Sequence, residues 1–323
     1  DKSVAWPHIN SGFLLGNGFF FMPHSSRPAL SGLLLAALGA IAFSGKAIIV
    51  KLSYVYGVDA VTVIMYRMLF ALPFFIAMGL WSERQAIARE NPLTRRDVID
   101  IVGLGFVGYY LSSYLDFLGL QYITASLERL ILYLNPTLVV VLGWLIYKKP
   151  IHPVRMLAMA VSYSGVMLVF AHELSFAGAD VALGGSLVFA SAVSYAVYLL
   201  YSGQLVQRIG SLRLVGWATS VACVCCIAQF VVLRPLSAAV VPVEVLWLAV
   251  LNSVACTVAP VLMVMMAIER IGAALTAQTG MIGPMSTITL GVWLLNEPLN
   301  AWIGVGTLLV VGGVFIVSKY GVK

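Results

Sequence analysis

The chain has 323 residues, of which 61% are hydrophobic and only 10% charged, and it carries a formal net charge of +6. A soluble domain has about 25% charged residues, so this composition excludes a water-soluble protein and makes the lipid bilayer the main solvent. The four cysteines lie in apolar segments and exclude a disulfide framework, and the Gly-x-Ser-x-Gly, His-Glu-x-x-His and phosphate-loop motifs of common enzymes do not occur.

Residues 1–27 are predicted to form an N-terminal tail that lies on the membrane surface or is disordered. The apolar stretch Phe13–Met22 within this tail is too short to span a bilayer, and Gly16 and Gly18 interrupt it. Because no basic segment precedes this stretch, we do not expect a signal peptide.

Ten apolar segments of suitable length follow, since a bilayer core of about 30 Å requires about 20 residues of helix. The predicted spans are residues 30–52, 60–80, 98–119, 125–147, 154–171, 182–201, 214–233, 245–267, 273–295 and 300–318. We therefore expect an all-α membrane protein of ten transmembrane helices. It divides into a first five-helix repeat at 28–172 and a second at 173–323, which ends in a short C-terminal tail.

The distribution of basic residues predicts the orientation of these helices. Fourteen Lys and Arg residues fall on the side of the N-terminus, whereas the opposite side has Lys51 and Arg234. By the positive-inside rule both termini lie in the cytoplasm, as expected for a bacterial-type inner membrane. The same charges are spread over several loops, so they indicate membrane topology rather than nucleic-acid binding.

An internal repeat relates the two halves at a shift of 148 residues. The informative matches are Pro136, Gly143, Pro150 and Gly165, which correspond to Pro284, Gly291, Pro298 and Gly313. Because each half has five helices, an odd number, the halves must have inverted topology, an arrangement typical of transporters. A proline weakens the hydrogen-bond ladder of a helix, and Pro136 and Pro284 are therefore candidate hinges.

Several segments resemble the EamA branch of the drug/metabolite transporter superfamily, across nearly all of residues 28–320. They are residues 42–51, Tyr66-Arg67, and a pattern that runs from Asn135-Pro136 to Pro150 and again from Gly283-Pro284 to Pro298. The family usually has an acidic residue after the fourth and ninth helices; Glu297 keeps it, whereas Lys149 replaces it in the first half. The resemblance implies a 5+5 inverted fold with a central cavity, and usually the export of amino acids or related metabolites.

Five charged residues fall inside the predicted spans: Lys46, Arg67, Asp116, Glu128 and Arg129. Each costs at least about 2.5–3.5 kcal/mol at the centre of a membrane helix, so each is a candidate functional residue. Their positions along the helices place all five in the outer half of the membrane. Two interpretations stay open: a structural network or outer gate closed by ion pairs, or direct binding of a charged or zwitterionic substrate.

Further candidates concern coupling and the lining of the cavity. Asp116 and Glu128 are candidate intramembrane proton carriers, which would make protons the coupling ion. Tyr198 is a candidate cavity-lining residue on the sixth helix, and Gln278 lies six residues before Pro284. The four histidines lie outside the predicted spans, and we expect neither a metal site nor a cofactor.

The predicted function is that of a secondary transporter, without enzymatic activity, that exports a small polar metabolite such as an amino acid or related zwitterion. Transport would proceed by alternating access through a central cavity between the two repeats. The alternatives are a carrier for a sugar phosphate, a nucleotide-like or a lipid-linked substrate, and a channel or partner subunit. We expect a monomer or homodimer in contact with membrane lipid, with a small-molecule substrate and no nucleic-acid partner.

Overall fold

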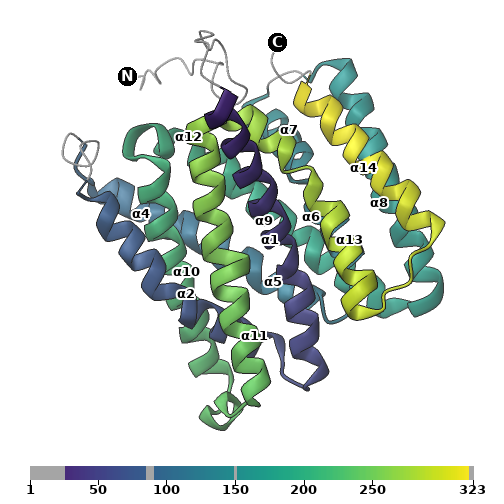
Figure 1. Cartoon of the computed structure of the whole chain (residues 1–323), viewed down its shortest axis with the longest axis horizontal. Coiled ribbons are helices and arrows are strands. Elements are labelled where there is room, and N and C mark those ends of the chain that lie inside the picture. Colours follow the sequence, from purple (N-terminus) through teal and green to yellow (C-terminus); the bar gives the residue numbers. More distant parts are fainter. Residues whose placement is uncertain (1–25, 85–90, 149–150, 320–323) are drawn as a thin grey trace, which may run out of the picture.

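A computed structural model describes residues 26–84, 91–148 and 151–319, together with most of their side chains. Every regular element within these residues is a helix (Figure 1). The elements are α1 (Ser26–Val55), α2 (Ala60–Ser82), α4 (Arg95–Leu104), η1 (Gly105–Leu111), α5 (Ser112–Gly119), α6 (Ala125–Leu132), α7 (Asn135–Tyr147), α8 (Pro153–Ala177), α9 (Ala179–Ile209), α10 (Ser211–Leu233), η2 (Leu236–Ala239), α11 (Val243–Ser253), η3 (Val254–Val258), α12 (Ala259–Thr279), α13 (Ile282–Leu295) and α14 (Ala301–Lys319). The predicted N-terminal tail lies outside the described residues, except for its last two positions, which begin α1.

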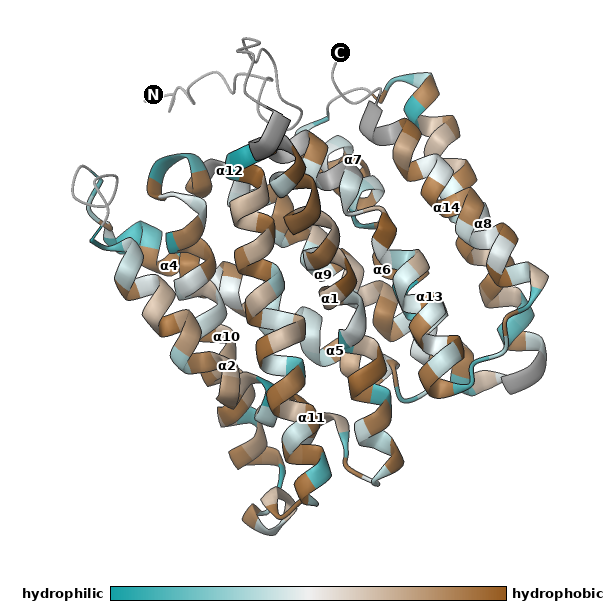
Figure 2. Ribbon diagram, viewed as in Figure 1, coloured by the Kyte–Doolittle hydropathy of each residue, from teal (hydrophilic) through white to brown (hydrophobic). Residues whose placement is uncertain are grey.

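Eight helical stretches of the described chain are long and apolar enough to cross a membrane. They are Leu30–Val55, Ala60–Ser82, Arg95–Gly119, Ala125–Tyr147, Pro153–Ser175, Ala179–Gly203, Ser211–Leu233 and Val243–Gly272. Two shorter apolar helices, Ile282–Leu295 and Ala301–Ile316, occupy the places of the last two predicted spans. Large apolar side chains such as Trp247 and Leu308 are exposed on the bundle surface, and hydrophobic residues follow the helices over their whole length (Figure 2). This is an integral membrane protein.

Several helices continue past their predicted ends. α8 runs on to Ala177 and ends at Gly178, which has a φ of 61°. His172 and Glu173 therefore lie inside the candidate span Pro153–Ser175. The prediction that all four histidines lie outside the spans is wrong for His172, because no proline or glycine lies between Gly165 and Gly178 to end the helix earlier.

Helices of the two halves pack against each other in pairs, α8 with α14, α2 with α10 and α1 with α12 (Figure 1). Glycines permit the closest approach between α8 and α14. A Cβ atom added at Gly165 would lie 2.7 Å from the carbonyl oxygen of Gly306, and one added at Gly313 would lie 2.5 Å from that of Ala158. Close packing through small residues is a common way for helices to associate in a membrane.

The helices are interrupted at equivalent places in the two repeats. α6 ends just before Pro136, and α12 ends just before Pro284, so each proline lies in the first turn of the following helix, α7 or α13. A proline is tolerated there because the first N–H groups of a helix have no partner within it. Both of these helices end at a left-handed residue with a φ of 54°, Lys148 for α7 and Asn296 for α13, and these two residues are again 148 positions apart.

Two π-helical turns also coincide under the repeat. η1 interrupts the third span and η3 the eighth. Such turns widen the helix locally and are frequent at functional sites. In η1 the carbonyl oxygen of Val107 accepts a hydrogen bond of 2.7 Å from the Ser194 hydroxyl of α9, so the irregular turn is stabilised by the neighbouring helix.

Candidate functional site

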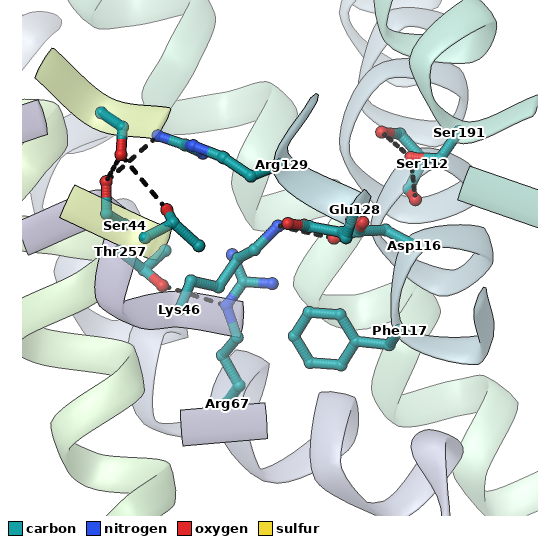
Figure 3. Close-up of polar contacts among 12 residues, drawn as sticks. Ser44, Lys46, Arg67, Ser112, Asp116, Phe117, Glu128, Arg129, Ser191 and Thr257 are labelled. Carbon is teal, nitrogen blue, oxygen red and sulfur yellow. Dashed lines mark hydrogen bonds and ion pairs between the residues drawn. The ribbon is translucent and has the colours of Figure 1, made fainter. Parts of the chain in front are cut away.

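The ammonium group of Lys46 on α1 lies between two carboxylates from other helices. Its Nζ atom is 2.5 Å from Asp116 Oδ2 of α5 and 3.3 Å from Glu128 Oε1 of α6 (Figure 3). All three residues are buried, Glu128 completely. A charge removed from water is strongly destabilising unless an opposite charge compensates it. This ion-pair triad therefore links three helices electrostatically.

The ends of two helices position these carboxylates. The hydroxyl of Thr124 caps α6 by accepting the N–H of Leu127 at 3.0 Å, and Glu128 follows about one turn later. Asp116 lies in the last turn of α5, which ends at Gly119. The sequence had placed both acids about one turn from the helix ends, and the structure brings both to the same lysine.

Arg67 of α2 extends from the first repeat to the π-helical turn of the second. Its Nε donates a hydrogen bond of 3.0 Å to Thr257 Oγ1 in η3, and its guanidinium lies 5.1 Å from the centre of the Phe117 ring (Figure 3). Thr257 in turn donates to the carbonyl oxygen of Asn252 at 2.9 Å. Pro260, which follows η3, has no N–H for the carbonyl one turn earlier. This proline gives a local reason for the irregular turn that receives Arg67.

Arg129 of α6 points in a different direction from its neighbour Glu128, as expected for consecutive residues of a helix. Its Nη2 donates to Ser44 Oγ of α1 at 3.4 Å, and its guanidinium lies 5.2 Å from the centre of the Phe43 ring. The Ser44 hydroxyl also lies 2.9 Å from the carbonyl oxygen of Gly283 (Figure 3). Arg129 thus reaches the interruption before α13, beside Pro284.

We call Lys46, Arg67, Asp116, Glu128 and Arg129 the charged cluster. Five of its buried polar atoms have no hydrogen-bond partner within the described chain: Arg67 Nη1, Asp116 Oδ1, both Glu128 oxygens and Arg129 Nε, although Glu128 Oε1 is ion-paired with Lys46. An unpaired buried polar group costs about 1–3 kcal/mol, so such groups are rare. Three cations and two carboxylates also leave one positive charge in excess when both acids are ionised. The charged cluster therefore has unused donors, unused acceptors and one excess positive charge that attracts a carboxylate.

Ion pairs hold both ends of α2, the helix that carries Arg67, against α10. At one end Glu83 accepts two hydrogen bonds from the buried Arg213 guanidinium, one of them 2.7 Å long, and a third of 3.0 Å from Trp217 Nε1. These bonds, those from Arg213 above all, hold the pKa of Glu83 below its usual value of 4.5. At the other end Arg234 lies 3.1 Å from Asp59. The α2–α10 pair therefore acts as one unit.

The remaining predicted residues are Tyr198, Gln278 and the two prolines. Tyr198 is buried between α9 and η1, with its hydroxyl 3.2 Å from that of Tyr109 and its ring stacked on Tyr195. Its surroundings are those of a packed aromatic group. The side chain of Gln278 lies outside the described residues, and Pro136 and Pro284 lie at the helix interruptions.

Sequence reasoning missed several polar partners of the site. Glu297 was known only as the acid typical of the family, whereas the structure shows that it caps α6. Its carboxylate accepts the N–H of Ala125 at 2.7 Å and the hydroxyl of Ser126 at 2.7 Å. Thr257 was not singled out and Ser44 was expected only to pack, because an isolated hydroxyl in an apolar helix usually bonds to its own backbone. The described residues bring together no group of three His, Cys, Asp or Glu side chains suited to a metal ion.

Comparison with known proteins agrees with this architecture. The chain is 28% identical over 303 residues to the uncharacterized transporter YcbK of Bacillus subtilis (strain 168), covering 90% of this chain and 92% of that protein. An uncharacterized transporter of Archaeoglobus fulgidus is 22% identical and covers 88% of this chain and 96% of its own length. A crystal structure with 17% sequence identity covers 90% of this chain and 97% of its own with a TM-score of 0.60, which shows the fold alone.

The internal repeat also appears in the comparison with protein families. The profile of the EamA-like transporter family matches the sequence twice, at residues 30–171 and at residues 182–319. The two matches cover nearly all of the described helices, one in each half. The chain therefore belongs to the EamA-like transporter family of the drug/metabolite transporter superfamily.

Proposed function

We propose that the protein is a secondary transporter, not an enzyme, that exports a small zwitterionic metabolite across a bacterial-type inner membrane. Membership in the EamA-like transporter family supports the general function. In the proposed topology, ten helices form two inverted five-helix repeats with both termini in the cytoplasm, as the distribution of basic residues indicates. The equivalent interruptions before Pro136 and Pro284 are the proposed hinges for alternating access.

The observation that carries the choice of substrate is the set of unpaired polar atoms in the charged cluster. Arg67 Nη1 and Arg129 Nε are buried donors without acceptors, and Asp116 Oδ1 is a buried acceptor without a donor. Arginine binds carboxylates and carboxylates bind ammonium groups through charge-assisted hydrogen bonds. An amino acid or related zwitterion supplies both partners, a carboxylate for the arginines and an ammonium group for Asp116.

The same cluster offers a route for proton coupling. Lys46 is shared between Asp116 and Glu128, and it is closer to Asp116. Glu128 is fully buried, and neither of its oxygens accepts a hydrogen bond within the described chain. Burial disfavours an ionised carboxylate, so we propose that Glu128 exchanges a proton when the substrate ammonium arrives or leaves.

Counterflow in proteoliposomes tests this function. Vesicles preloaded with one unlabelled compound at a time would be assayed for uptake of the same labelled compound, with amino acids, a sugar phosphate and a nucleotide as separate arms. We expect saturable exchange of an amino acid, its loss in Arg129→Ala and its retention in Arg234→Ala, a matched removal of an exposed arginine. Exchange of the sugar phosphate or nucleotide alone, or flux linear in concentration for every compound, would overturn the proposal.

A further inference from the structure

A cavity of about 500 Å³ opens beside the last residues of α1 and the segment that follows α13. These helix ends lie low in Figure 1. The floor of the cavity is apolar and includes Ile123, Val181 and Ile303. Its polar lining includes Lys51, Gln121, Thr124, Glu173, Glu297 and Asn300. An apolar pocket of 300–1,000 Å³ with a few convergent polar groups is typical of small-molecule sites. We call it the outer cavity, since the proposed topology places it on the outer side.

One of the two acids in the outer cavity is already used by the fold. Glu297 accepts hydrogen bonds from the first N–H groups of α6, those of Ala125 and Ser126. The N-terminus of a helix carries a partial positive charge that compensates a carboxylate there. Glu297 therefore holds α6 in place and is not the principal ligand of the cavity.

The other two charged groups, Lys51 and Glu173, attract each other electrostatically but form no direct ion pair within the described chain. No acidic group of the described chain lies within ion-pair distance of Lys51, which is half-buried on α1. Glu173 of α8 likewise has no cation at that distance, and its Oε1 accepts the hydroxyl of Thr124 at 2.5 Å. An ammonium group and a carboxylate thus line the same cavity without pairing with each other.

We propose that the outer cavity is a second binding site for a small zwitterion, with Lys51 binding its carboxylate and Glu173 its ammonium group. The apolar floor accepts the remainder of the molecule. The site would bind the same class of ligand as the charged cluster. That it is a second binding site on the export path, an exit station for the substrate, rests on the proposed export function.

The two sites follow each other along two helices. Glu128 lies one turn deeper than Thr124 in α6, and Lys46 lies five residues before Lys51 in α1, which is about 7.5 Å along the axis. A substrate released from the charged cluster along α1 and α6 would therefore reach the outer cavity next. Each site offers a cation for the ligand's carboxylate and a carboxylate for its ammonium group. Two such sites in series would let the ligand move outward without exposing an unpaired charge to lipid.

Protection of a single cysteine tests the outer cavity directly. Gln121→Cys, in the full chain with Cys225→Ser, would be labelled with a membrane-impermeant maleimide in phosphatidylglycerol nanodiscs. The probes are glycine, alanine, glutamine and leucine, with glutarate and cadaverine as single-sign controls. We expect at least one amino acid to slow labelling about threefold or more, and neither control to do so. Lys51→Met and Glu173→Gln should each raise the half-protecting concentration about tenfold, as for the loss of a charged hydrogen bond.

Matched variants separate the possible outcomes. Glu244→Gln removes a carboxylate from a different cavity, lined by Tyr56 and Trp247, and should leave protection unchanged. Arg129→Ala should abolish transport but keep protection, so loss of transport does not count against the outer cavity. Protection by no amino acid, or equal protection in Lys51→Met, overturns the proposal. Lys51-dependent protection by phosphatidylethanolamine nanodiscs alone would assign the cavity to a lipid headgroup with the same charges, and would overturn its role as an exit station.

Discussion

Arg67 and Thr257 are 190 positions apart in the sequence, yet the guanidinium of Arg67 donates to the hydroxyl of Thr257 at 3.0 Å. The bond joins the two halves of the protein, since Arg67 belongs to the first repeat and Thr257 to the π-helical turn of the second. It also leaves Nη1 of the same guanidinium without a partner within the described chain. Arg67 therefore combines a structural contact between the halves with a donor that is available to a ligand.

The first prediction concerns this arginine and the buried acid Glu128. We expect Arg67→Ala and Glu128→Ala each to reduce transport at least about tenfold, since each removes a charge-assisted hydrogen bond or proton-exchanging group from the binding site. Uptake into proteoliposomes measures the effect, and size-exclusion profiles check the fold. Arg234→Ala is the control. Wild-type transport in both variants would show that the charged cluster has no functional role.

The second prediction concerns the ion-pair triad. Lys46→Met should destabilise the protein by about 3–5 kcal/mol, because it leaves Asp116 and Glu128 buried together without their cation. Lys46→Met combined with Asp116→Asn should recover part of this loss, since only one uncompensated acid then remains. Thermal unfolding in detergent measures both variants. Additive losses in the double variant would contradict the coupling between the two residues.

The third prediction compares two adjacent glycines of α14. A Cβ atom at Gly313 would lie 2.5 Å from a backbone oxygen of α8, whereas one at Gly312 would meet nothing within 4 Å. Gly313→Ala should therefore lower stability by about 1–3 kcal/mol through overpacking, and Gly312→Ala should be neutral or slightly stabilising. Melting temperatures in detergent provide the test, and equal effects of the two substitutions would refute the close contact between α8 and α14.

The fourth prediction is a pH dependence of stability. The native pKa of Glu83 lies below 4.5 because Arg213, and secondarily Trp217, donate hydrogen bonds to its carboxylate. The unfolded chain then binds a proton at higher pH than the native one, so the stabilisation is fully present above pH 4.5 and is lost as the pH falls through the lowered native pKa.

Melting temperatures of wild type and Glu83→Gln between pH 7 and pH 3 test this dependence. The wild type should be the more stable at neutral pH, and the difference should shrink below pH 4.5 as Glu83 becomes protonated. A difference that stays constant over the whole range would show that the Glu83–Arg213 pair does not depend on the ionised carboxylate.

The depth of the charged residues could be predicted from the sequence, but their partners could not. Depth follows from counting residues along a helix at a fixed rise of 1.5 Å, and this placed Asp116 and Glu128 in one layer. A partner depends on how each helix is rotated and on which helix lies beside it. Lys46 could equally have met only one acid, and the contacts of Tyr198 with Tyr109 and Tyr195 could not be predicted either.

The amino-acid sequence by itself determined that the protein lies in a lipid bilayer, that it contains an internal repeat, and that its buried charges share one layer. These features follow from hydropathy, internal similarity and position along a helix, which can be read from the chain without knowing its tertiary contacts. The tertiary structure decided which charges meet, that Glu297 caps α6, and that Lys51 and Glu173 line one cavity. It also showed that α8 carries His172 within its span. These features depend on contacts between residues far apart in the chain, and such contacts are set by the packing of whole helices.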